Sequence, residues 1–462
     1  MKLTFIGAGG ARTPLVIQSL LHHQDRLPFS HVCLMDTDAE RLALMRVASK
    51  PRLVAHPPSF RLSWTTDARE AIEGADFIVM TFRAGLMQSR VVDEQVPLKH
   101  GVLGQETTGP GGFAMALRTI PILLDYVETI RRLAPAAWLL NFTNPAGMVT
   151  EAVTRVAGFE RAVGICDNPS SMVRAAASTL GVPPGRLFPE YYGLNHLGWL
   201  RAIYLDGVDQ KPKLLNGGHV LGLPFDLDFV KALDAFPNEY LYFFYQSKQS
   251  VENLLRAGQS RAQQILPFND ALYDGLRRIR RLKTIFDDEA EDPAAVDAVY
   301  ARYLRQRGST YMTLETGAAT HGASDTASDQ EAIAAAAEGY SAVALGVIEA
   351  LTGEHAATPI LNVPNRGVLP GMADDDVVEV TCHVGNGVIR PLALGALPEH
   401  ALGLMKSLKA YERLTIQAAV EGSYALAVKA LALHPLVPSY ETARRILDGY
   451  IAEHGDYFPT LR

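Results

Sequence analysis

The chain has 462 residues, of which 48% are hydrophobic and 20% charged, and this composition is typical of a soluble globular enzyme with two closely packed domains. Its formal net charge is −7 and it has no long basic run, so neither nucleic acid nor an anionic membrane is expected as a partner. A bound phosphate would need a local group of arginines and helix N-termini.

The cysteine content and the apolar stretches predict a cytoplasmic protein. Three cysteines cannot form a closed disulfide framework, and their spacing matches no zinc motif. The chain begins with a strand and a turn, which is not the pattern of a signal peptide. Its most apolar helical stretch, 331–351, is interrupted by two glutamates and falls short of the ~20 apolar residues that span a bilayer.

The first part of the chain alternates between apolar strands and helical patterns. Uninterrupted apolar runs such as 76–82 and 137–143 are typical of parallel strands covered on both faces. The alternation predicts βαβ units and a Rossmann-type parallel sheet, which we assign to a domain of residues 1–165. Strands are predicted at 2–7, 31–36, 60–66, 76–82, 137–143 and 162–166, with helices at 13–23 and 38–54.

The pattern changes in the second part, residues 166–462, which we assign to a C-terminal α/β domain. It begins with a strand and hairpin pattern at 191–205, and a largely helical segment follows at 226–310. Strands at 375–395 come after a Pro/Gly-rich segment at 358–371, and one long helix is predicted at about 398–432. The patterns leave open whether strands of both parts share one sheet.

The first strand–helix junction carries a dinucleotide-binding pattern. Gly7, Gly9 and Gly10 follow the first strand and open a helix, as required for close approach to a pyrophosphate. Arg12 replaces the third glycine of the usual motif, so the motif alone is weak. Asp36 ends the second strand, where an acid binds the adenosine ribose and favours NAD over NADP. The structural alternative is a tight turn with Asp36 as a helix N-cap.

Polar residues gather in a loop and after a central strand. The loop 101–118 reads GVLGQETTGPGGFAMALR, a composition common in binding loops, and Arg90 just precedes it. Arginine suits bidentate recognition of phosphate, although a single arginine is more often a surface charge. Asn144 lies in the motif NFTNP at the end of a predicted central strand, where it could bind a ligand or cap the following helix.

A cysteine and a histidine offer two ligands for a divalent ion. Cys166 and Asp167 lie in the motif GICDNP at the end of a predicted strand, and His196 lies in GLNHLGW. A thiolate and an imidazole can anchor a metal and leave positions open for substrate oxygens. The alternatives are a simple buried cysteine and a histidine satisfied in the interior.

The segment PNEYLYFFYQ (237–246) is rich in tyrosine. Tyrosines at this density are usually core or interface residues, but one of them can act as a base if a cation lowers its pKa. The spacing does not choose among Tyr240, Tyr242 and Tyr245. Arg261, in the motif GQSRAQQ (258–264), has no distinguishing feature on its own.

Taken together, these motifs resemble glycoside hydrolase family 4 over nearly the whole chain. The resemblance runs through GAGG-x-x-TP, GQETTGPGG, NxTNP, GICDxP, GxNHLxW, the tyrosine cluster, SRA around Arg261, and residues 409–437. The family shares its N-terminal fold with malate and lactate dehydrogenases. It implies an exception to the two-carboxylate mechanism, in which NAD+ oxidises C3 of the sugar, a tyrosine removes the C2 proton, and the glycosidic oxygen leaves by elimination.

The resemblance also implies a role for each candidate residue. Mn2+, or another divalent metal, would be held by Cys166 and His196, with substrate oxygens and water completing its shell. The acid would be Asp167 and the base Tyr240, with Tyr242 in reserve. Glu106 would tune the base, and Arg90, Asn144 and Arg261 would bind the substrate.

The favoured substrate is a phosphorylated disaccharide or glucoside of the 6-phospho-β-glucoside type, because GLNHLGW and the C-terminal stretch resemble the family's β-type branch. The family's 6-phospho-β-glucosidases often carry Asn after the metal-binding cysteine, whereas α-specific members carry Asp, as this chain does at Asp167. A 6-phospho-α-glucosidase and an enzyme for unphosphorylated sugars are therefore alternatives within the family. Outside it, the alternatives are a 2-hydroxy acid dehydrogenase with His196 as acid/base and a non-catalytic NAD-binding protein. A homodimer or homotetramer is expected.

Overall fold

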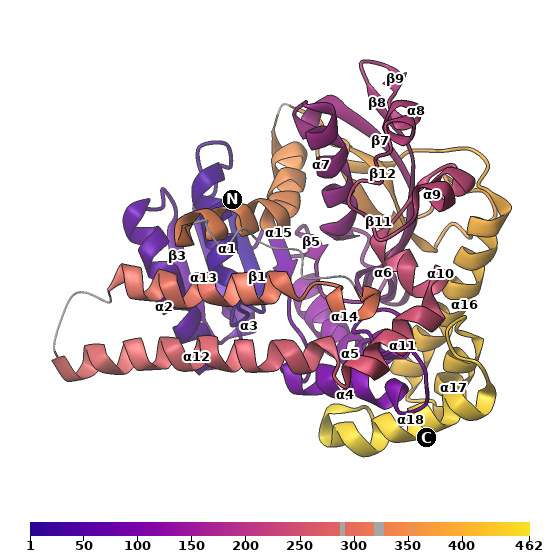
Figure 1. Cartoon of the computed structure of the whole chain (residues 1–462). Helices are drawn as coiled ribbons and strands as arrows, with labels where there is room; N and C mark the ends of the chain where they lie inside the picture. The colour runs from indigo at the N-terminus through magenta and orange to yellow at the C-terminus, as the bar shows by residue number, and fades with distance from the viewer. Residues whose placement is uncertain (287–291, 318–327, 354) are drawn as a thin grey trace.

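The structure is a computed structural model that describes residues 1–286, 292–317, 328–353 and 355–462. Within these residues the central element is a nine-stranded sheet in the order β13-β12-β11-β6-β5-β4-β1-β2-β3 (Figure 1). Neighbours among β1–β6 pair in parallel, whereas β11–β13 are antiparallel. The strands are β1 Lys2–Ile6, β2 His31–Met35, β3 Arg61–Thr65, β4 Phe77–Met80, β5 Trp138–Asn141, β6 Ala162–Gly164, β11 Ile360–Pro364, β12 Val377–Gly385 and β13 Val388–Pro391.

The parallel half has the strand order of a Rossmann fold, so the predicted α/β class is confirmed. Its central strands are buried on both faces, and Ile78, Met80 and Leu140 have no exposed surface. Right-handed crossovers place α1 (Thr13–His23) and α2 (Ala39–Ala55) on one face, and α3 (Ala68–Ile72) and α5 (Pro110–Leu133) on the other. Proline at the start of α1 and the Asp38 side chain at the start of α2 fix these helix ends.

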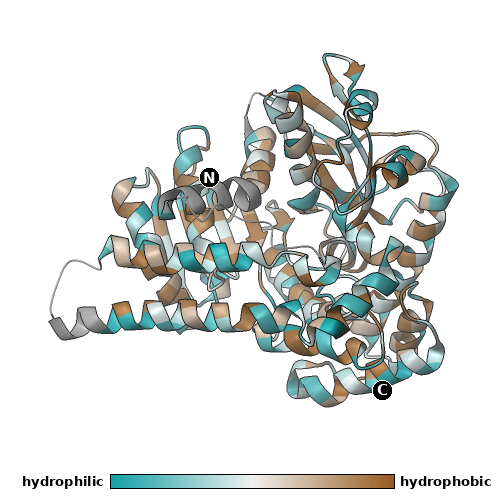
Figure 2. Ribbon diagram, viewed as in Figure 1, coloured by the Kyte–Doolittle hydropathy of each residue, from teal (hydrophilic) through white to brown (hydrophobic). Residues whose placement is uncertain are grey.

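Helices from the second half cover α1 and α2. They are α12 (Arg261–Phe286), α13 (Pro293–Ser309) and α15 (Asp329–Thr352), and Figure 1 shows α12 and α13 side by side at the lower left. Figure 2 shows hydrophilic residues recurring along α12 and α13 and hydrophobic residues on the central strands. The second half thus packs directly on the helices that follow β1 and β2.

A second, smaller sheet carries a hairpin of β7 (Leu187–Leu194) and β8 (Leu197–Leu205), with β10 (Phe236–Pro237) beside β8. Two facing glycines let the hairpin strands approach. A Cβ on Gly193, whose φ is +154°, would lie 2.3 Å from the Cα of Gly198. The hairpin therefore presents a tight two-residue turn, and His196 is its second residue.

Two features differ from the sequence-based prediction. The Pro/Gly-rich segment 358–371 contains β11, which pairs with β6 and β12 and so joins the two halves in one sheet. The predicted helix 398–432 is two helices, α16 (Glu399–Glu421) and α17 (Tyr424–Leu433), because Gly422 takes a left-handed φ of +64° and Ser423 caps the second. The division into 1–165 and 166–462 stays a prediction about folding units. No helix in the described ranges is long and apolar enough to cross a membrane.

Candidate active site

The turn after β1 is built around glycines and one carboxylate. Gly7 has a φ of +101°, and a Cβ there would lie 2.7 Å from the backbone of Thr81. The Gly9 N–H donates to Asp36 Oδ2 at 2.7 Å, and a Cβ on Gly9 would lie 2.8 Å from that carboxyl group. Gly10 opens the turn into α1, where its N–H donates to the Gly7 carbonyl. These residues fit an adenosine diphosphate moiety, since backbone and carboxylate converge without side chains between them.

Two tyrosines of the second half hydrogen-bond to the backbone of this segment. No sequence motif marks either of them. Tyr273 of α12 donates its hydroxyl hydrogen to the carbonyl of Gly9 at 3.0 Å, and Tyr300 of α13 donates to that of Ala11 at 2.8 Å. The Arg41 guanidinium lies 4.3 Å from the centre of the Tyr273 ring. The helices that cover α2 therefore also fix the nucleotide-binding loop.

The structure brings Cys166 and His196 together. Cys166 follows β6, His196 lies in the hairpin turn with a left-handed φ of +63°, and Cys166 Sγ is 3.6 Å from His196 Nε2. Thr107 Oγ1 contacts His196 Nδ1 at 2.9 Å, the kind of outer contact that fixes a metal-binding imidazole. Within the described residues no group of three or more His, Cys, Asp and Glu could hold a metal. The pair fits an open two-ligand site completed by substrate or water oxygens.

Charge and burial also fit a cation at this pair. Burial lowers the pKa of His196 to about 4, against the opposing charges of Glu106 and Asp167, so its imidazole is neutral and able to bind a metal. Burial, with the charges of Glu379 and Asp167, raises the pKa of the Cys166 thiol well above its ordinary value. A divalent cation is the partner that would reverse this shift and stabilise the thiolate.

Tyr240 lies directly on the histidine. Its ring is stacked on that of His196 with centroids 3.8 Å apart and 6° between the planes. The Asn238 side chain accepts a hydrogen bond from the Tyr240 N–H at 3.0 Å and fixes the short helix η3 (Glu239–Leu241). Tyr242, the reserve candidate, instead lies in an aromatic cluster, 6.0 Å from the ring of Phe225.

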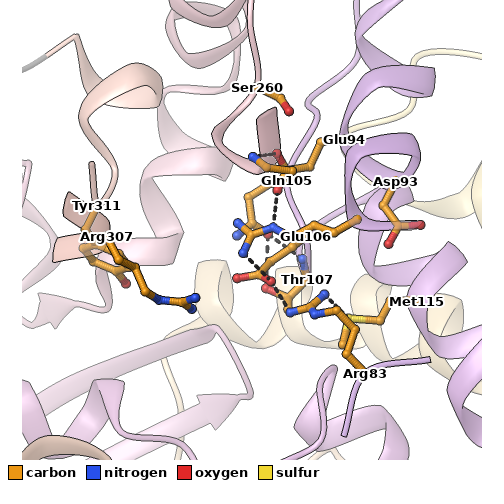
Figure 3. Close-up of polar contacts among 12 residues, drawn as sticks. Arg83, Asp93, Glu94, Gln105, Glu106, Thr107, Met115, Ser260, Arg307 and Tyr311 are labelled. Carbon is orange, nitrogen blue, oxygen red and sulfur yellow. Dashed lines mark hydrogen bonds and ion pairs between the residues drawn. The ribbon is translucent and has the colours of Figure 1, made fainter. Parts of the chain in front are cut away.

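Glu106 lies among arginines. Arg83 donates a hydrogen bond to it (Figure 3). Arg90 Nη1 lies 3.0 Å from Glu106 Oε2. Burial alone would raise the pKa of Glu106, but the positive charges, that of Arg90 first, hold it well below its usual range. Arg90 is 1% exposed and is also paired with Glu94 at 2.7 Å. Its substrate-binding role stays a prediction, and its described contacts are with these two carboxylates.

Arg261, at the start of α12, has its guanidinium 4.5 Å from the centre of the Tyr311 ring. Burial lowers its pKa, and the charges of Arg90 and Arg307 add to the effect. Figure 3 shows Arg307 on the opposite side of Glu106 from Arg83. Arg307, of α13, had no sequence signal, because it approaches Glu106 only through the packing of distant helices.

The last two candidates lie at the rim. Asp167 Oδ2 is 3.8 Å from Arg12 Nη1, so the residue in place of the third glycine reaches the candidate acid. Asn144 Oδ1 accepts from the Ala146 N–H at 3.3 Å at the start of α6 (Ala146–Glu151). The N-cap of α6 is Pro145, so Asn144 lies one residue before the cap, and substrate binding by Asn144 stays a prediction.

Two residues beside Tyr240, the candidate base, were not predicted from the sequence. Glu239 directly precedes Tyr240, and its carboxylate accepts hydrogen bonds from the Tyr311 hydroxyl and the Asn168 amide. Its position in the tyrosine-rich segment 237–246 is the signal that could have indicated Glu239. Tyr311 follows α13, and no local pattern marks it.

Comparison with known proteins agrees with this geometry. The model of family 4 glycosyl hydrolases matches residues 2–182, and that of the family 4 glycosyl hydrolase C-terminal domain matches residues 191–437. A probable 6-phospho-beta-glucosidase of Bacillus subtilis is 31% identical over 99% of this chain and 97% of its own length. A phospho-alpha-glucosidase of Clostridium acetobutylicum is also 31% identical, over 100% of this chain and 99% of its own.

Among solved structures, the 6-phospho-beta glucosidase of Thermotoga maritima with NAD and glucose-6-phosphate superposes with a TM-score of 0.83, at 27% identity and over the full length of both chains. A 6-phospho-alpha-glucosidase from gut microorganisms with NAD and Mn2+ gives a TM-score of 0.78 at 28% identity, over 100% of this chain and 99% of that one. Because the two family models cover both halves of the chain and the relatives match it end to end, the chain belongs to family 4 of the glycosyl hydrolases, as its motifs predict.

Proposed function

We propose that this protein hydrolyses 6-phospho-β-glucosides in a reaction that depends on NAD+ and a divalent metal such as Mn2+. The observation that carries the proposal is the grouping of Cys166 and His196, 3.6 Å apart, with the Tyr240 ring stacked on the histidine. Support comes from the Thermotoga maritima enzyme, whose structures hold NAD and glucose-6-phosphate and, in one case, manganese. The relatives include both 6-phospho-beta- and 6-phospho-alpha-glucosidases.

When bound, NAD+ supplies a reversible hydride acceptor for C3 of the sugar, which acidifies C2, and the metal supplies Lewis acidity toward sugar oxygens. Gly7, Gly9, Gly10 and Asp36 hold the nucleotide, and Cys166 and His196 hold the metal.

The remaining residues move protons and position the sugar. Tyr240 takes the C2 proton, and Asp167 protonates the departing glycosidic oxygen. Glu106 stays ionised among its arginines, and its negative charge contributes to the electrostatic field at Tyr240. Arg261, Arg90 and Asn144 bind the substrate.

The second candidate is a 6-phospho-α-glucosidase, and Asp167 favours it. This residue occupies the position that resembles the α-specific members, and its side chain is 45% exposed at the start of α7 (Asn168–Leu180). A carboxyl group placed there can reach a leaving oxygen, whereas an asparagine cannot donate a proton in the same way.

The deciding experiment is hydrolysis of p-nitrophenyl β- and α-glucoside 6-phosphates, each with and without NAD+, Mn2+ and EDTA. We expect turnover of the β-anomer that requires both cofactors and stops on chelation. Turnover of the α-anomer alone would select the second candidate. Failure with both, together with turnover of the unphosphorylated glucosides, would move the substrate to a sugar without phosphate.

We also propose that the protein is a homodimer or homotetramer, which the family resemblance supports. Light scattering coupled to size-exclusion chromatography tests this by comparing the measured mass with the 50.2 kDa of one chain. A mass that stays at this value at micromolar concentration would contradict it.

A further inference from the structure

A short chain of hydrogen-bonding groups runs away from Tyr240. Its hydroxyl lies 3.4 Å from that of Tyr311, and the Tyr311 hydroxyl donates to the carboxylate of Glu239. The groups come from two places in the chain, η3 and the turn between α13 and α14 (Thr313–Thr316). Because Tyr311 donates to Glu239, its oxygen lone pairs are free to accept from Tyr240.

Glu239 is an unusual group to place behind a tyrosine for structural reasons alone. Its two described hydrogen-bond partners, Tyr311 and Asn168, are neutral, and a partly buried carboxylate without a cationic hydrogen-bond partner is costly. Burial raises its pKa to about 7, with the charge of Asp167 adding to the rise, while the two hydrogen bonds and Arg261 oppose it. A carboxyl group of this kind can gain and lose a proton near neutral pH.

We propose that Glu239 accepts the proton of Tyr240 through the Tyr311 hydroxyl while Tyr240 removes the C2 proton of the sugar. This inference rests on the proposed function, in which Tyr240 is the base. Glu239 and Tyr311 act through Tyr240, so both are positioning residues. The arrangement follows the logic of a nucleophile backed by a base, in which the group behind the reacting atom takes up its proton.

The transfers balance over one cycle. The C2–H bond breaks and its proton passes to the Tyr240 oxygen, the Tyr240 phenolic proton passes to Tyr311, and the Tyr311 proton passes to Glu239. The electron pair left at C2 forms the enediolate of the sugar and then the C1–C2 double bond as the C1–O bond breaks, and the leaving oxygen takes a proton from Asp167. When C2 is protonated again after water adds, the same transfers run backward and Glu239 returns to a carboxylate.

The test compares Glu239→Gln and Tyr311→Phe with the wild type, using the NAD+-loaded enzyme with Mn2+ held at saturation at every pH. Because the relay needs ionised Glu239, the wild-type kcat should fall as pH drops through the Glu239 pKa. Each variant should lose this acid limb of the kcat–pH profile. Its kcat should fall roughly 10- to 100-fold with KM nearly unchanged. This loss is smaller than the ~10²–10⁴-fold typical of a group that transfers the proton directly.

A second readout separates a relay from a structural contact. With substrate deuterated at C2, the isotope effect on kcat should rise in both variants, because C2 deprotonation becomes slower than the other steps. The double variant should be no slower than either single one, since both changes break the same path. Tyr245→Phe is the matched control, because the Tyr245 hydroxyl contacts Trp199 rather than this chain.

The outcomes also distinguish this inference from the proposed function. If Tyr240→Phe abolishes turnover while both relay variants keep the acid limb and the wild-type isotope effect, the relay is wrong and the base assignment stands. If Tyr240→Phe is fully active, the proposed function fails first. A lower kcat with an unchanged acid limb and isotope effect would assign Glu239 a structural role and overturn the relay. Should Glu239→Gln fail to fold, Tyr311→Phe decides alone.

Discussion

The two ends of the site are built in different ways. At the cofactor end, the groups expected to bind the nucleotide lie in one βαβ unit, where the turn of residues 7–10 and Asp36 hydrogen-bond directly to one another. The second half adds the hydroxyl contacts of Tyr273 and Tyr300 to backbone carbonyls of this segment. The catalytic end combines Thr107, Cys166, His196 and Tyr240, which lie on four separate segments. A contiguous motif can hold its geometry through local backbone constraints, whereas a site assembled from distant segments depends on how the two halves pack. If the two ends are independent, a change at one end should leave ligand binding at the other end unchanged.

The largest effect is expected for Cys166→Ser. Losing the thiolate should remove the metal, and turnover should fall by about three orders of magnitude or more, because a Lewis acid contributes several kcal/mol. NAD+ affinity should stay within about twofold, since Cys166 lies outside the nucleotide turn. Turnover, Mn2+ binding by electron paramagnetic resonance and NAD+ titration measure the three effects. Full activity would sink the metal assignment, and lost NAD+ binding would show that the two ends are coupled.

The next effect in size is Tyr240→Phe. Removing the hydroxyl should lower kcat by about 10²–10⁴-fold, because the base for C2 is lost while the ring stays stacked on His196. Tyr242→Phe is the matched control and should change kcat less than about twofold, since that ring lies in the cluster with Phe225. Steady-state kinetics and circular dichroism of both variants provide the check. If Tyr242→Phe lowers kcat and Tyr240→Phe does not, the base is Tyr242 and the assignment to Tyr240 is wrong.

A smaller effect, on NAD+ binding at the cofactor end, is expected for Asp36→Ala. Loss of a charged acceptor for the nucleotide and for the Gly9 N–H should weaken NAD+ binding about 10- to 100-fold, in line with ~1.5–3 kcal/mol for a charged hydrogen bond. Mn2+ binding should be unchanged. Asp38→Ala is the control, because Asp38 caps α2 without touching the turn. Calorimetric NAD+ titrations that give equal affinities for both variants would assign Asp36 a purely structural part.

This contrast also explains what the sequence could predict. The strands β1–β6, the glycine turn and Asp36 follow from local periodicity and from the order of one motif. Cys166 and His196 were found because each sits in a distinctive motif at the rim of the sheet. Arg307 and Tyr311 were not, because they approach the site only when α12 and α13 pack on α2. A residue of this kind has an ordinary local sequence, and its function depends on tertiary contacts alone.

Strand β11 was missed for a similar reason. Its residues lie in a Pro/Gly-rich segment, and their strand character comes from pairing with β6 and β12. Arg90 shows the opposite case, a residue that the sequence singled out as a candidate but whose ion-pair partners it did not indicate. A single arginine predicts anion recognition, whereas its ion pairs with Glu94 and Glu106 require knowledge of where the loop 101–118 folds.

The smallest effect concerns stability at the catalytic end. Glu379 of β12 is fully buried beneath the hairpin turn and accepts hydrogen bonds from the side chains of Asn195, Asn362 and Tyr191. Burial raises its pKa to about 7 from the 4.5 of an ordinary glutamate. The folded state therefore holds a proton that the unfolded state releases, so the stabilisation is complete below pH 4.5 and is lost as pH rises through 7.

Glu379→Gln should remove this dependence, because an amide stays neutral and its oxygen can still accept from both asparagines. In the metal-free protein, the Tm of the wild type should fall more steeply between about pH 5 and pH 8 than that of the variant. Glu190→Gln, on the neighbouring β7 and paired with Arg201, is the control and should leave the slope unchanged. Parallel Tm profiles for wild type and Glu379→Gln would mean that Glu379 is ionised in the folded protein, and the turn that carries His196 would then rest on a buried charge.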